Sequence, residues 1–380
     1  MNGNTIAANI YFNDDVTYTG TAGSETNPYC IEDFWDLVLV SSYSYSYSPF
    51  NLDHENRYAL FVKDIDMNDY PDITTQIMNG TVTYRYSTYT YTFTSFLLRW
   101  KQIDGNGYCL RNLCVYGNTF GSNKGIFYMY LTTLKIKNLD IINFISYSNN
   151  SLFSANSGTT TLTFEKCNFG VYYYNLTNGF IVSLTCSQYI HYSKFEKCTI
   201  NFKGSCYNMA LLGNSTYSTK PTFNLCHINI DKMNGIGCLF HCAGSADYTT
   251  YGGTYFTYIT GRMRNVVTTT STGSAENTFL VNSVGSSHIG PFFNKFIMNY
   301  VNIKLEYDKT ATPGVVRIIS TSAIYPSPAP NVINETNLID GAYPIFYNKG
   351  DNTNIRHITD TQLKDPVFLN SIGFSVYDSN

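Results

Sequence analysis

Short groups of apolar residues recur along the chain with the same internal spacing. Each group has the form apolar-x-x-apolar-x-apolar, and neighbouring groups in the central part of the chain start 26 to 31 residues apart. The groups are Leu110/Leu113/Val115, Ile136/Leu139/Ile141, Phe164/Cys167/Phe169, Phe195/Cys198/Ile200, Phe223/Cys226/Ile228, Met298/Val301/Ile303 and Ile333/Thr336/Leu338. Repeats of this length are typical of a solenoid, in which each unit buries its apolar face against its neighbours. We expect the repeat core to contain Leu113, Leu139, Cys167, Cys198, Cys226 and Val301.

A second apolar segment precedes each group at a nearly constant distance. These segments centre on Phe127, Phe153, Ile181, Leu211 and Phe240. Each repeat therefore holds at least two short strands, separated by polar turns that lack helical periodicity. This pattern predicts an all-β fold, a right-handed parallel β-helix in which each coil is one turn of the solenoid. Irregular spacing over residues 244–275 predicts one coil with longer excursions.

The chain divides into three regions on this basis. Residues 1–58 are expected to form an N-terminal capping region, because a solenoid with an open end exposes its core and unpaired strand edges. Within it, the spacing of apolar residues over 31–40 predicts a short helix. Residues 59–340 are expected to form the β-helix body, and residues 341–380 a C-terminal cap or attachment segment.

Two segments alternate aromatic and hydroxyl residues, a pattern typical of strands with one aromatic face. They cover residues 42–48 and 83–94, and the second is expected to protrude as a ribbon near residues 80–98. The tyrosines either pack on the solenoid wall or contact a partner subunit or a glycan, since tyrosine is favoured in recognition surfaces. The candidate binding residues are Tyr43, Tyr45, Tyr47, Tyr84, Tyr86, Tyr89 and Tyr91.

Composition narrows the possible partners. Charged residues make up only 13% of the 380 residues, the net charge is −3, and no basic stripe is present, so nucleic-acid binding is not expected. No run of 18 apolar residues occurs, so we expect no membrane insertion. The first ten residues lack the charged and apolar segments of a signal peptide, which favours cytoplasmic synthesis. A virion protein combines such synthesis with a charge-poor surface that is exposed outside the cell.

The ten cysteines are interpreted as free thiols. Cys167, Cys198 and Cys226 hold the same position in successive groups. The simplest interpretation is an interior ladder of small apolar side chains, because free cysteine is often buried and cytoplasmic synthesis keeps thiols reduced. Cys238, His241 and Cys242 resemble half of a metal site without the second half, so we expect no metal and no cofactor.

Two sets of carboxylates are candidates for chemistry. Glu165 and Glu196 hold equivalent repeat positions and would stack about 5 Å apart on successive coils. They form either a glycosidase-like pair or an exterior ladder in which each glutamate faces a neighbouring lysine, and the ladder is favoured. Asp64, Asp66 and Asp69 offer oxygen ligands for calcium, but turn capping is the favoured role because the spacing of a full calcium loop is missing.

Residues 59–142 resemble a repeat family of bacterial and phage surface proteins. The Asp64-Ile-Asp66 strand, the Asp104-Gly-Asn-Gly107 segment and the Gly125-Ile-Phe127 to Leu139 unit look like GLUG-type adhesin repeats. The resemblance implies a right-handed β-helix with a role in adhesion or virion structure. Independently of any family, Asp-Gly and Asn-Gly pairs predict a tight turn at residues 104–107.

The functional expectation is a non-enzymatic virion appendage protein. It would be of the phage tail or head fibre or spike type, and would serve structure and host-surface or glycan adhesion. Its expected partners are itself as a homotrimer, other virion proteins and a host-surface glycan or receptor. The alternatives are a glycan-degrading tailspike, acting as a glycosidase or lyase, and a bacterial cell-surface adhesin.

Overall fold

The computed structural model describes the central part of the chain most completely. The described residues are 23–34, 36–37, 57–72, 74, 82–86, 89–93, 96–98, 100–116, 127–129, 133–147, 151–155, 160–186, 190–213, 220–233, 236–242, 254–266, 278–283, 296–308, 317–321, 336–340, 355–358, 365 and 367. Within them no helix is long and apolar enough to cross a membrane.

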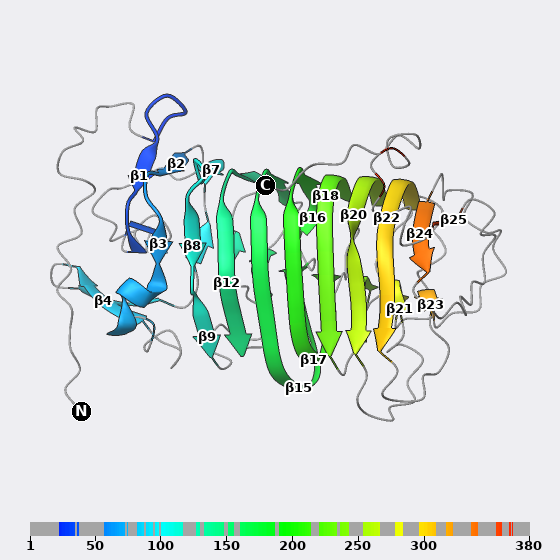
Figure 1. Cartoon of the computed structure of the whole chain (residues 1–380). Coiled ribbons are helices and arrows are strands. Elements are labelled where there is room, and N and C mark those ends of the chain that lie inside the picture. The colour runs from blue at the N-terminus through cyan, green and yellow to red at the C-terminus, as the bar shows by residue number, and fades with distance from the viewer. Residues whose placement is uncertain are drawn as a thin grey trace.

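The described residues form a parallel β-solenoid, as predicted. Its strands stack along one axis, and every pairing among them is parallel (Figure 1). In chain order they are β1 (Tyr29–Ile31), β2 (Tyr58–Phe61), β3 (Ile65–Asp66), β6 (Phe96–Leu98), β7 (Gln102–Asp104), β8 (Cys109–Arg111), β9 (Cys114–Tyr116), β10 (Phe127–Met129), β11 (Thr133–Lys137), β12 (Asp140–Tyr147), β13 (Phe153–Ala155), β14 (Thr160–Glu165), β15 (Asn168–Cys186), β16 (Ile190–Glu196), β17 (Thr199–Gly213), β18 (Lys220–Met233), β19 (Ile236–Cys242), β20 (Thr254–Val266), β21 (Thr278–Ser283), β22 (Phe296–Asp308), β23 (Arg317–Thr321), β24 (Thr336–Asp340) and β25 (Ile355–Ile358).

An apolar column runs through the interior of the solenoid. It follows the register of successive coils through Ile103, Ile136, Phe164, Phe195 and Phe223. Phe164, Phe195 and Phe223 are fully buried, and their rings stack with centroids 4.9 Å and 4.6 Å apart. The first apolar residues of three successive groups therefore form an aromatic stack, which continues the aliphatic column of Ile103 and Ile136.

The first apolar group lies one strand away from the others, so its predicted alignment was wrong. Leu110 pairs with Ile141, and Ile103 takes the place beside Ile136. Leu113 is buried, but it directly precedes β9, whose first residue Cys114 pairs with Ile145 of β12. Leu113 is therefore not aligned with Leu139 as predicted. The cause is the turn over residues 105–108, because one coil later only residues 138–139 separate the equivalent strands β11 and β12.

That turn has the local geometry that its sequence predicts. Asn106 and Gly107 have positive φ angles of 53° and 84°. A Cβ on Gly105 would lie 2.3 Å from the carbonyl oxygen of Asn138 in the next coil, so this position has no room for a side chain. The Asp104 carboxylate accepts hydrogen bonds from the Asn106 backbone at 2.9 Å and the Asn138 amide at 3.0 Å.

The gap in the apolar pattern after residue 228 is filled by strand β20, which pairs with the coils on either side. Residues 244–253 and 267–275, where the predicted excursions would lie, are outside the described residues. Strand β20 pairs Phe256 with Phe223 and Met298, and Ile259 with Cys226 and Val301. The third position of this group is Gly261, which replaces the usual apolar side chain. A Cβ there would lie 1.8 Å from the Ile228 carbonyl oxygen. The glycine hides the group from a search for apolar residues.

The companion strands exist as predicted, but two of their equivalent positions were misassigned. Phe127 pairs with Phe153, as expected. Phe153 then pairs with Thr185 rather than Ile181, and Thr185 pairs with Leu212 rather than Leu211. Leu212 pairs with Phe240. Register shifts in β15, between Tyr174 and Ile181, explain the displacement, because irregular pairing there changes the count of residues along the coil.

Left-handed residues mark one corner of successive coils. Asn138, Lys166, Lys197 and Leu225 have φ angles of 51°, 53°, 54° and 53°. At three of these corners the backbone N–H donates to a carbonyl of the next coil at 2.8–2.9 Å, namely Asn138 to Glu165, Lys166 to Glu196 and Lys197 to Asn224. Neighbouring coils therefore stay hydrogen-bonded at the corners, between one sheet of the solenoid and the next.

The predicted cysteine ladder is confirmed for three coils. Cys167, Cys198 and Cys226 directly follow the corner residues, are at most 2% exposed and are free thiols. Leu139 is buried at the equivalent place, whereas the side chain of Val301 is outside the described set. Burial is the largest cause that raises the pKa of the Cys226 thiol, which keeps it protonated.

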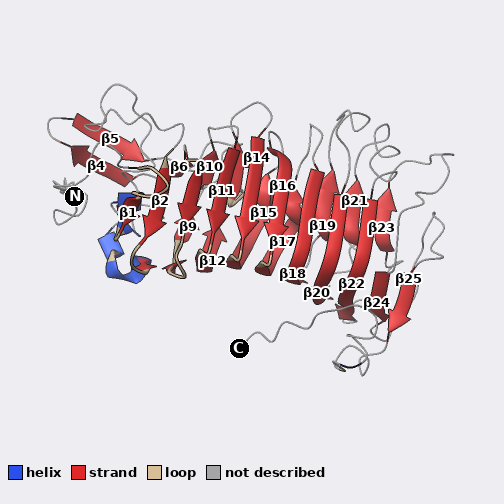
Figure 2. Ribbon diagram, turned by 90° about the horizontal axis from the view of Figure 1, so that it is seen from above, coloured by secondary structure: helices blue, strands red, loops and turns tan. Residues whose placement is uncertain are grey.

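The ends of the solenoid carry further elements. Within the predicted helix over 31–40, Phe34, Asp36 and Leu37 are helical, while Ile31 belongs to β1 and residues 38–40 lie outside the described ones. A 3-10 helix, η2 (Met67–Asp69), follows β3. Strands β4 (Val82–Tyr86) and β5 (Tyr89–Phe93) pair antiparallel as the predicted ribbon, which stands off from the stacked coils (Figure 2). At the other end β25 still pairs with β24.

Candidate functional site

The broad sheet of the solenoid carries a shallow groove on its outer wall. This sheet contains β12, β15, β17, β18, β20 and β22, which lie side by side in Figure 1. The groove spans three successive coils and has a volume of about 300 Å³. We call it the polar groove, and it is lined by Tyr172, Asn201, Phe202, Lys203, Asn229, Ile230 and Asp231.

The strand alternation explains which side chains reach the polar groove. Phe202 and Ile230 point into the core and are 1% and 5% exposed, so they form its floor. Their neighbours on either side point outward, as the period of two in a β-strand requires. Asn201, Lys203, Asn229 and Asp231 thus come from the same positions of two adjacent strands.

A ladder of side-chain amides forms one edge of the polar groove. The Asn229 amide nitrogen donates to the Asn201 side-chain oxygen at 2.9 Å and lies 3.1 Å from the His227 ring nitrogen Nε2. The next residue in this column is Gly170, which pairs with Asn201 and carries no side chain. The ladder fixes the amides on a rigid sheet, where they offer both donors and acceptors.

Two stacked tyrosines stand beside the polar groove. Tyr147 and Tyr174 have ring centroids 5.5 Å apart and an interplanar angle of 24°. Tyr174 is 38% exposed and lies two residues beyond Tyr172 on the same outward face. We call this pair the aromatic shelf. Its rings offer an apolar surface and its hydroxyls offer polar groups, next to the amides and charged groups of the polar groove.

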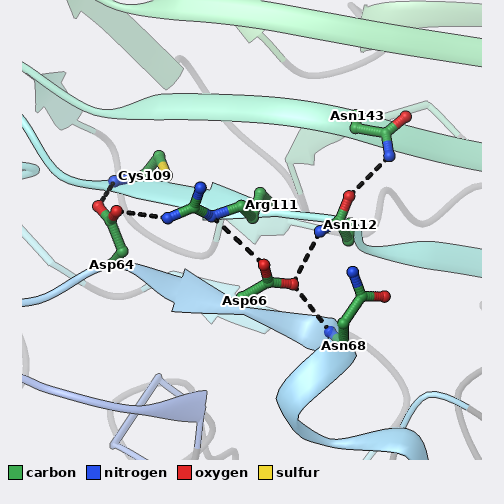
Figure 3. A network of polar contacts seen from close by, with 7 residues as sticks. All are labelled: Asp64, Asp66, Asn68, Cys109, Arg111, Asn112 and Asn143. Atoms are coloured by element: carbon green, nitrogen blue, oxygen red, sulfur yellow. Dashed lines mark hydrogen bonds and ion pairs between the residues drawn. The ribbon is translucent and has the colours of Figure 1, made fainter.

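Two of the three aspartates that offered oxygen ligands for calcium are engaged in a structural network (Figure 3). Asp64 accepts a hydrogen bond from the Cys109 backbone at 3.0 Å and forms an ion pair with Arg111. Asp66 caps η2 by accepting from the Asn68 backbone at 2.9 Å, and it accepts from the Asn112 amide at 2.7 Å. The hydrogen bond from Asn112 is the main cause that lowers the pKa of Asp66. Turn capping, the favoured interpretation, is therefore confirmed for Asp66, whereas Asp64 links its coil to the next one through Cys109 and Arg111.

The same network extends across the coils through asparagine. The Asn143 amide donates to the Asn112 side-chain oxygen at 2.6 Å, so Asp66, Asn112 and Asn143 link three coils (Figure 3). Both asparagines have positive φ angles, 62° and 53°. Among the described residues, no group of three histidine, cysteine, aspartate or glutamate side chains is placed to hold a metal ion.

Glu165 and Glu196 pair in register on adjacent strands, as predicted, and each has a lysine partner. Glu165 lies 2.6 Å from the Lys135 ammonium, and Glu196 lies 3.6 Å from that of Lys194. Glu196 also accepts from the Asn224 amide at 2.8 Å. The hydrogen bond from Lys135 lowers the pKa of Glu165, which keeps it anionic, whereas a general acid needs a raised pKa. These contacts agree with an exterior charge ladder.

The tyrosines predicted from alternation lie away from the polar groove or outside the described residues. Tyr43, Tyr45 and Tyr47 are among the residues that the structure leaves undescribed. In the β4–β5 ribbon the register pairs Tyr84 with Tyr91 and Tyr86 with Tyr89, which places these four positions on one face. His241 pairs with Asn282 in the β19–β21 ladder, and its side chain is outside the described set.

The residues of the polar groove were missed by sequence reasoning, although a signal for them exists. Asn201-Phe-Lys203 and Asn229-Ile-Asp231 follow the last apolar residue of two successive groups. The polar positions of this alternating pattern mark outward residues of a strand, and their recurrence in adjacent repeats marks a shared surface.

Comparison with known protein families, characterised proteins and solved structures finds no match for this chain. The class of the protein is therefore defined by its own fold and surface. It is a parallel β-solenoid with a polar groove and an aromatic shelf on its broad wall.

Proposed function

We propose that this chain is a non-enzymatic virion appendage protein, of the phage tail or head fibre or spike type, that adheres to a host-surface glycan. The observation that carries the proposal is the polar groove beside the aromatic shelf. Sugars present hydroxyl groups around a ring with an apolar face. Paired amides, a lysine and an aspartate match the hydroxyls, and an exposed tyrosine matches the ring face.

The rigidity of the wall supports an adhesive role. The polar side chains of the groove stand on strands that are paired on both sides, so little conformational freedom is lost when a ligand binds. A shallow groove on a long wall also suits a polymer, which binds along its length rather than inside an enclosed cavity. The resemblance of residues 59–142 to GLUG-type adhesin repeats supports the same role.

The charges of the polar groove favour binding over cleavage. A glycosidase needs two carboxyl groups that face each other across the scissile bond. Among the described residues that line the groove, Asp231 is the one carboxylate. Glu165 and Glu196 lie outside the groove, and each forms an ion pair with a lysine.

The assembly is proposed to be a homotrimer on a virion, with three solenoids side by side. The long wall offers room for both subunit contacts and ligand contacts, as in other elongated symmetric appendages. Sedimentation equilibrium of the full chain gives the oligomeric state directly. A monomeric mass would overturn the trimer without affecting the glycan proposal.

The test combines binding, product analysis and location. The full recombinant chain is incubated with capsular and cell-wall polysaccharides of the host, and binding is followed by biolayer interferometry. We expect binding that Asn229→Ala and Tyr174→Ala weaken and that Thr163→Ala, on the outer side of β14, leaves unchanged. We also expect no shortening of the polysaccharide and stoichiometric presence of the chain in purified particles.

Each contrary outcome points to a different function. Shortened polysaccharide would indicate a glycan-degrading spike and would direct mutagenesis to Glu165 and Glu196. Location on a cell envelope instead of a particle would indicate a bacterial adhesin. Failure to bind any host polysaccharide would overturn glycan adhesion.

A further inference from the structure

We propose that Gly170, where a line of side-chain amides on the broad wall is interrupted, marks a subsite for the acetamido group of an N-acetylated amino sugar. The inference rests on the proposed glycan adhesion and deepens it by naming the chemical group that the wall recognises. It starts from the order of the outward asparagines along the solenoid axis.

The line of amides has two hydrogen-bonded segments. In the first, Asn112 donates to Asp66 at 2.7 Å, and Asn143 donates to Asn112 at 2.6 Å. In the second, Asn229 donates to Asn201 at 2.9 Å. In each of these hydrogen bonds the nitrogen comes from the later coil and the oxygen from the earlier one. Both segments therefore run in the same direction.

Gly170 occupies the coil between the two segments, and we call its place the amide gap. Gly170 pairs with Asn201 on one side, and on the other side it lies opposite the β12 bulge that contains Asn143. Figure 3 shows the side-chain oxygen of Asn143 pointing away from Asn112. Among the described residues, this oxygen and the amide nitrogen of Asn201 have no hydrogen-bond partner. The amide gap thus begins with an acceptor and ends with a donor.

The backbone does not require glycine at position 170. The φ angle of Gly170 is not left-handed, and the nearest contact of an added Cβ would be the Asn143 backbone nitrogen at 3.4 Å. At Gly105 and Gly261, by contrast, a Cβ would lie 2.3 Å and 1.8 Å from a carbonyl oxygen. Glycine weakens a strand, and inside one it often marks a bulge or the close approach of a ligand. Since the bulge here leaves room for a side chain, the unused room points to a ligand.

The length of the amide gap selects an amide over a single hydroxyl. Neighbouring coils are about 4.8 Å apart, so the flanking amides of Asn143 and Asn201 are about 9.6 Å apart, centre to centre. The nitrogen and oxygen of one amide are about 2.2 Å apart, which leaves about 7.4 Å between the facing oxygen and nitrogen. One hydroxyl with two hydrogen bonds spans about 5.6 Å, whereas an amide with two hydrogen bonds spans about 8 Å.

An acetamido group has the donor and the acceptor that the amide gap requires. Its N–H donates to the Asn143 oxygen, and its carbonyl oxygen accepts from the Asn201 amide. The two groups of a trans amide point in opposite directions, as the line of amides demands. A carboxylate has no donor and an ammonium has no acceptor, so either would leave one end of the gap unpaired.

The sugar ring that carries the acetamido group lies against Tyr172. This tyrosine follows Gly170 by two residues on the same outward face of β15, about 7 Å along the strand, and it lines the polar groove. Its ring offers an apolar surface to the sugar, and Tyr174 of the aromatic shelf follows two residues later. The amide gap is therefore continuous with the polar groove.

Gly170→Asn tests the inference by filling the amide gap with an amide of the protein itself. The added side chain has room and joins the two segments, so we expect the variant to fold and to resist urea at least as well as the original chain. The matched control is Thr163→Asn, which adds the same amide on the outer side of β14. Gly170→Ala fills only part of the gap and decides the test if the asparagine variant is less stable.

The experiment uses host capsular and cell-wall polysaccharides in three forms: untreated, de-N-acetylated and re-N-acetylated. We expect the full chain to bind the first and third forms at least about tenfold more tightly than the second, because de-N-acetylation removes the acceptor of the acetamido group. Gly170→Asn should weaken binding of the untreated form at least about tenfold, and Gly170→Ala about two- to fivefold, whereas Thr163→Asn should change it less than about twofold.

The outcomes separate this inference from the proposed function. Equal binding of the untreated and de-N-acetylated forms, or binding only of polysaccharides without amino sugars, would overturn the acetamido ligand while leaving glycan adhesion intact. Equal effects of Gly170→Asn and Thr163→Asn, or unchanged binding by Gly170→Ala, would remove the ligand from the amide gap. Binding of no polysaccharide in any form would overturn glycan adhesion itself.

Discussion

Phe195 offers the most direct test of the interior aromatic stack. Its side chain is fully buried and lies between Phe164 and Phe223, with ring centroids 4.9 Å and 4.6 Å away. The ring planes of Phe195 and Phe223 differ by only 1°. Replacing Phe195 with alanine removes both stacking contacts and leaves a cavity that two rigid neighbouring coils cannot close.

The expected loss follows from burial and cavity formation. A buried phenylalanine replaced by alanine costs about 3–5 kcal/mol, and we expect the upper half of this range because both neighbours are aromatic and the backbone is fixed by parallel pairing. Phe195→Leu keeps most of the volume and should cost about 1–2 kcal/mol. Lys194→Ala changes an exposed side chain of the same strand and should cost less than about 0.5 kcal/mol.

The measurement is urea unfolding of the full chain, followed by circular dichroism. Because solenoids unfold along one dimension, hydrogen exchange of β14, β16 and β18 is measured in parallel to localise the loss. We expect Phe195→Ala to lower the unfolding midpoint and to speed exchange in these three strands before the others. The reasoning would be refuted if Phe195→Ala cost no more than Lys194→Ala, or if exchange in β16 stayed as slow as in the original chain.

Three further predictions concern other parts of the fold. The ladder thiols Cys167, Cys198 and Cys226 should not react with Ellman's reagent in the folded chain and should react after denaturation, because each is at most 2% exposed and the reagent cannot reach it; fast labelling of the native protein at Cys226 would contradict the ladder. Leu225→Asn should raise the free energy of unfolding by about 0.5–1 kcal/mol, because asparagine tolerates the left-handed conformation at a φ of 53° better than leucine does; a loss in thermal or urea stability would count against this. Burial raises the pKa of Asp36 to about 7, so the folded chain holds a proton that the unfolded chain releases near pH 4, and stability should fall between about pH 4 and 7 with a slope of at most about 1.4 kcal/mol per pH unit. Asp36→Asn should flatten that slope, and an unchanged slope in urea titrations across this range would show that another group is responsible.

The repeat architecture could be predicted from the sequence because its signal is periodic. The groups at Phe164, Phe195 and Phe223 differ little in spacing, and each buries the same position. The failures have physical causes of two kinds. A tight turn added residues beside Asp104, and a glycine at position 261 removed an apolar side chain where the backbones approach closely. Both coils keep their parallel pairing, but the apolar pattern that identifies a coil in the sequence is altered.

The polar groove could not be predicted in the same way. Asn201 and Asn229 are distant in sequence, and only the register of β17 and β18 makes them neighbours that share a hydrogen bond. A surface pattern carries little information in a single sequence, because many outward positions are polar. The tyrosine alternation was easier to see but led to the ribbon instead of the broad wall.

The corners at Asn138, Lys166 and Lys197 make the same hydrogen bond to the next coil. A coil is therefore an interchangeable part, with identical connectors above and below. Duplicating or deleting one coil would lengthen or shorten the wall and leave its cross-section intact. Each added or deleted coil would change the number of contacts with a long polymer by the same amount. The affinity for the polymer would then depend on the number of coils, while every single contact stays as it is.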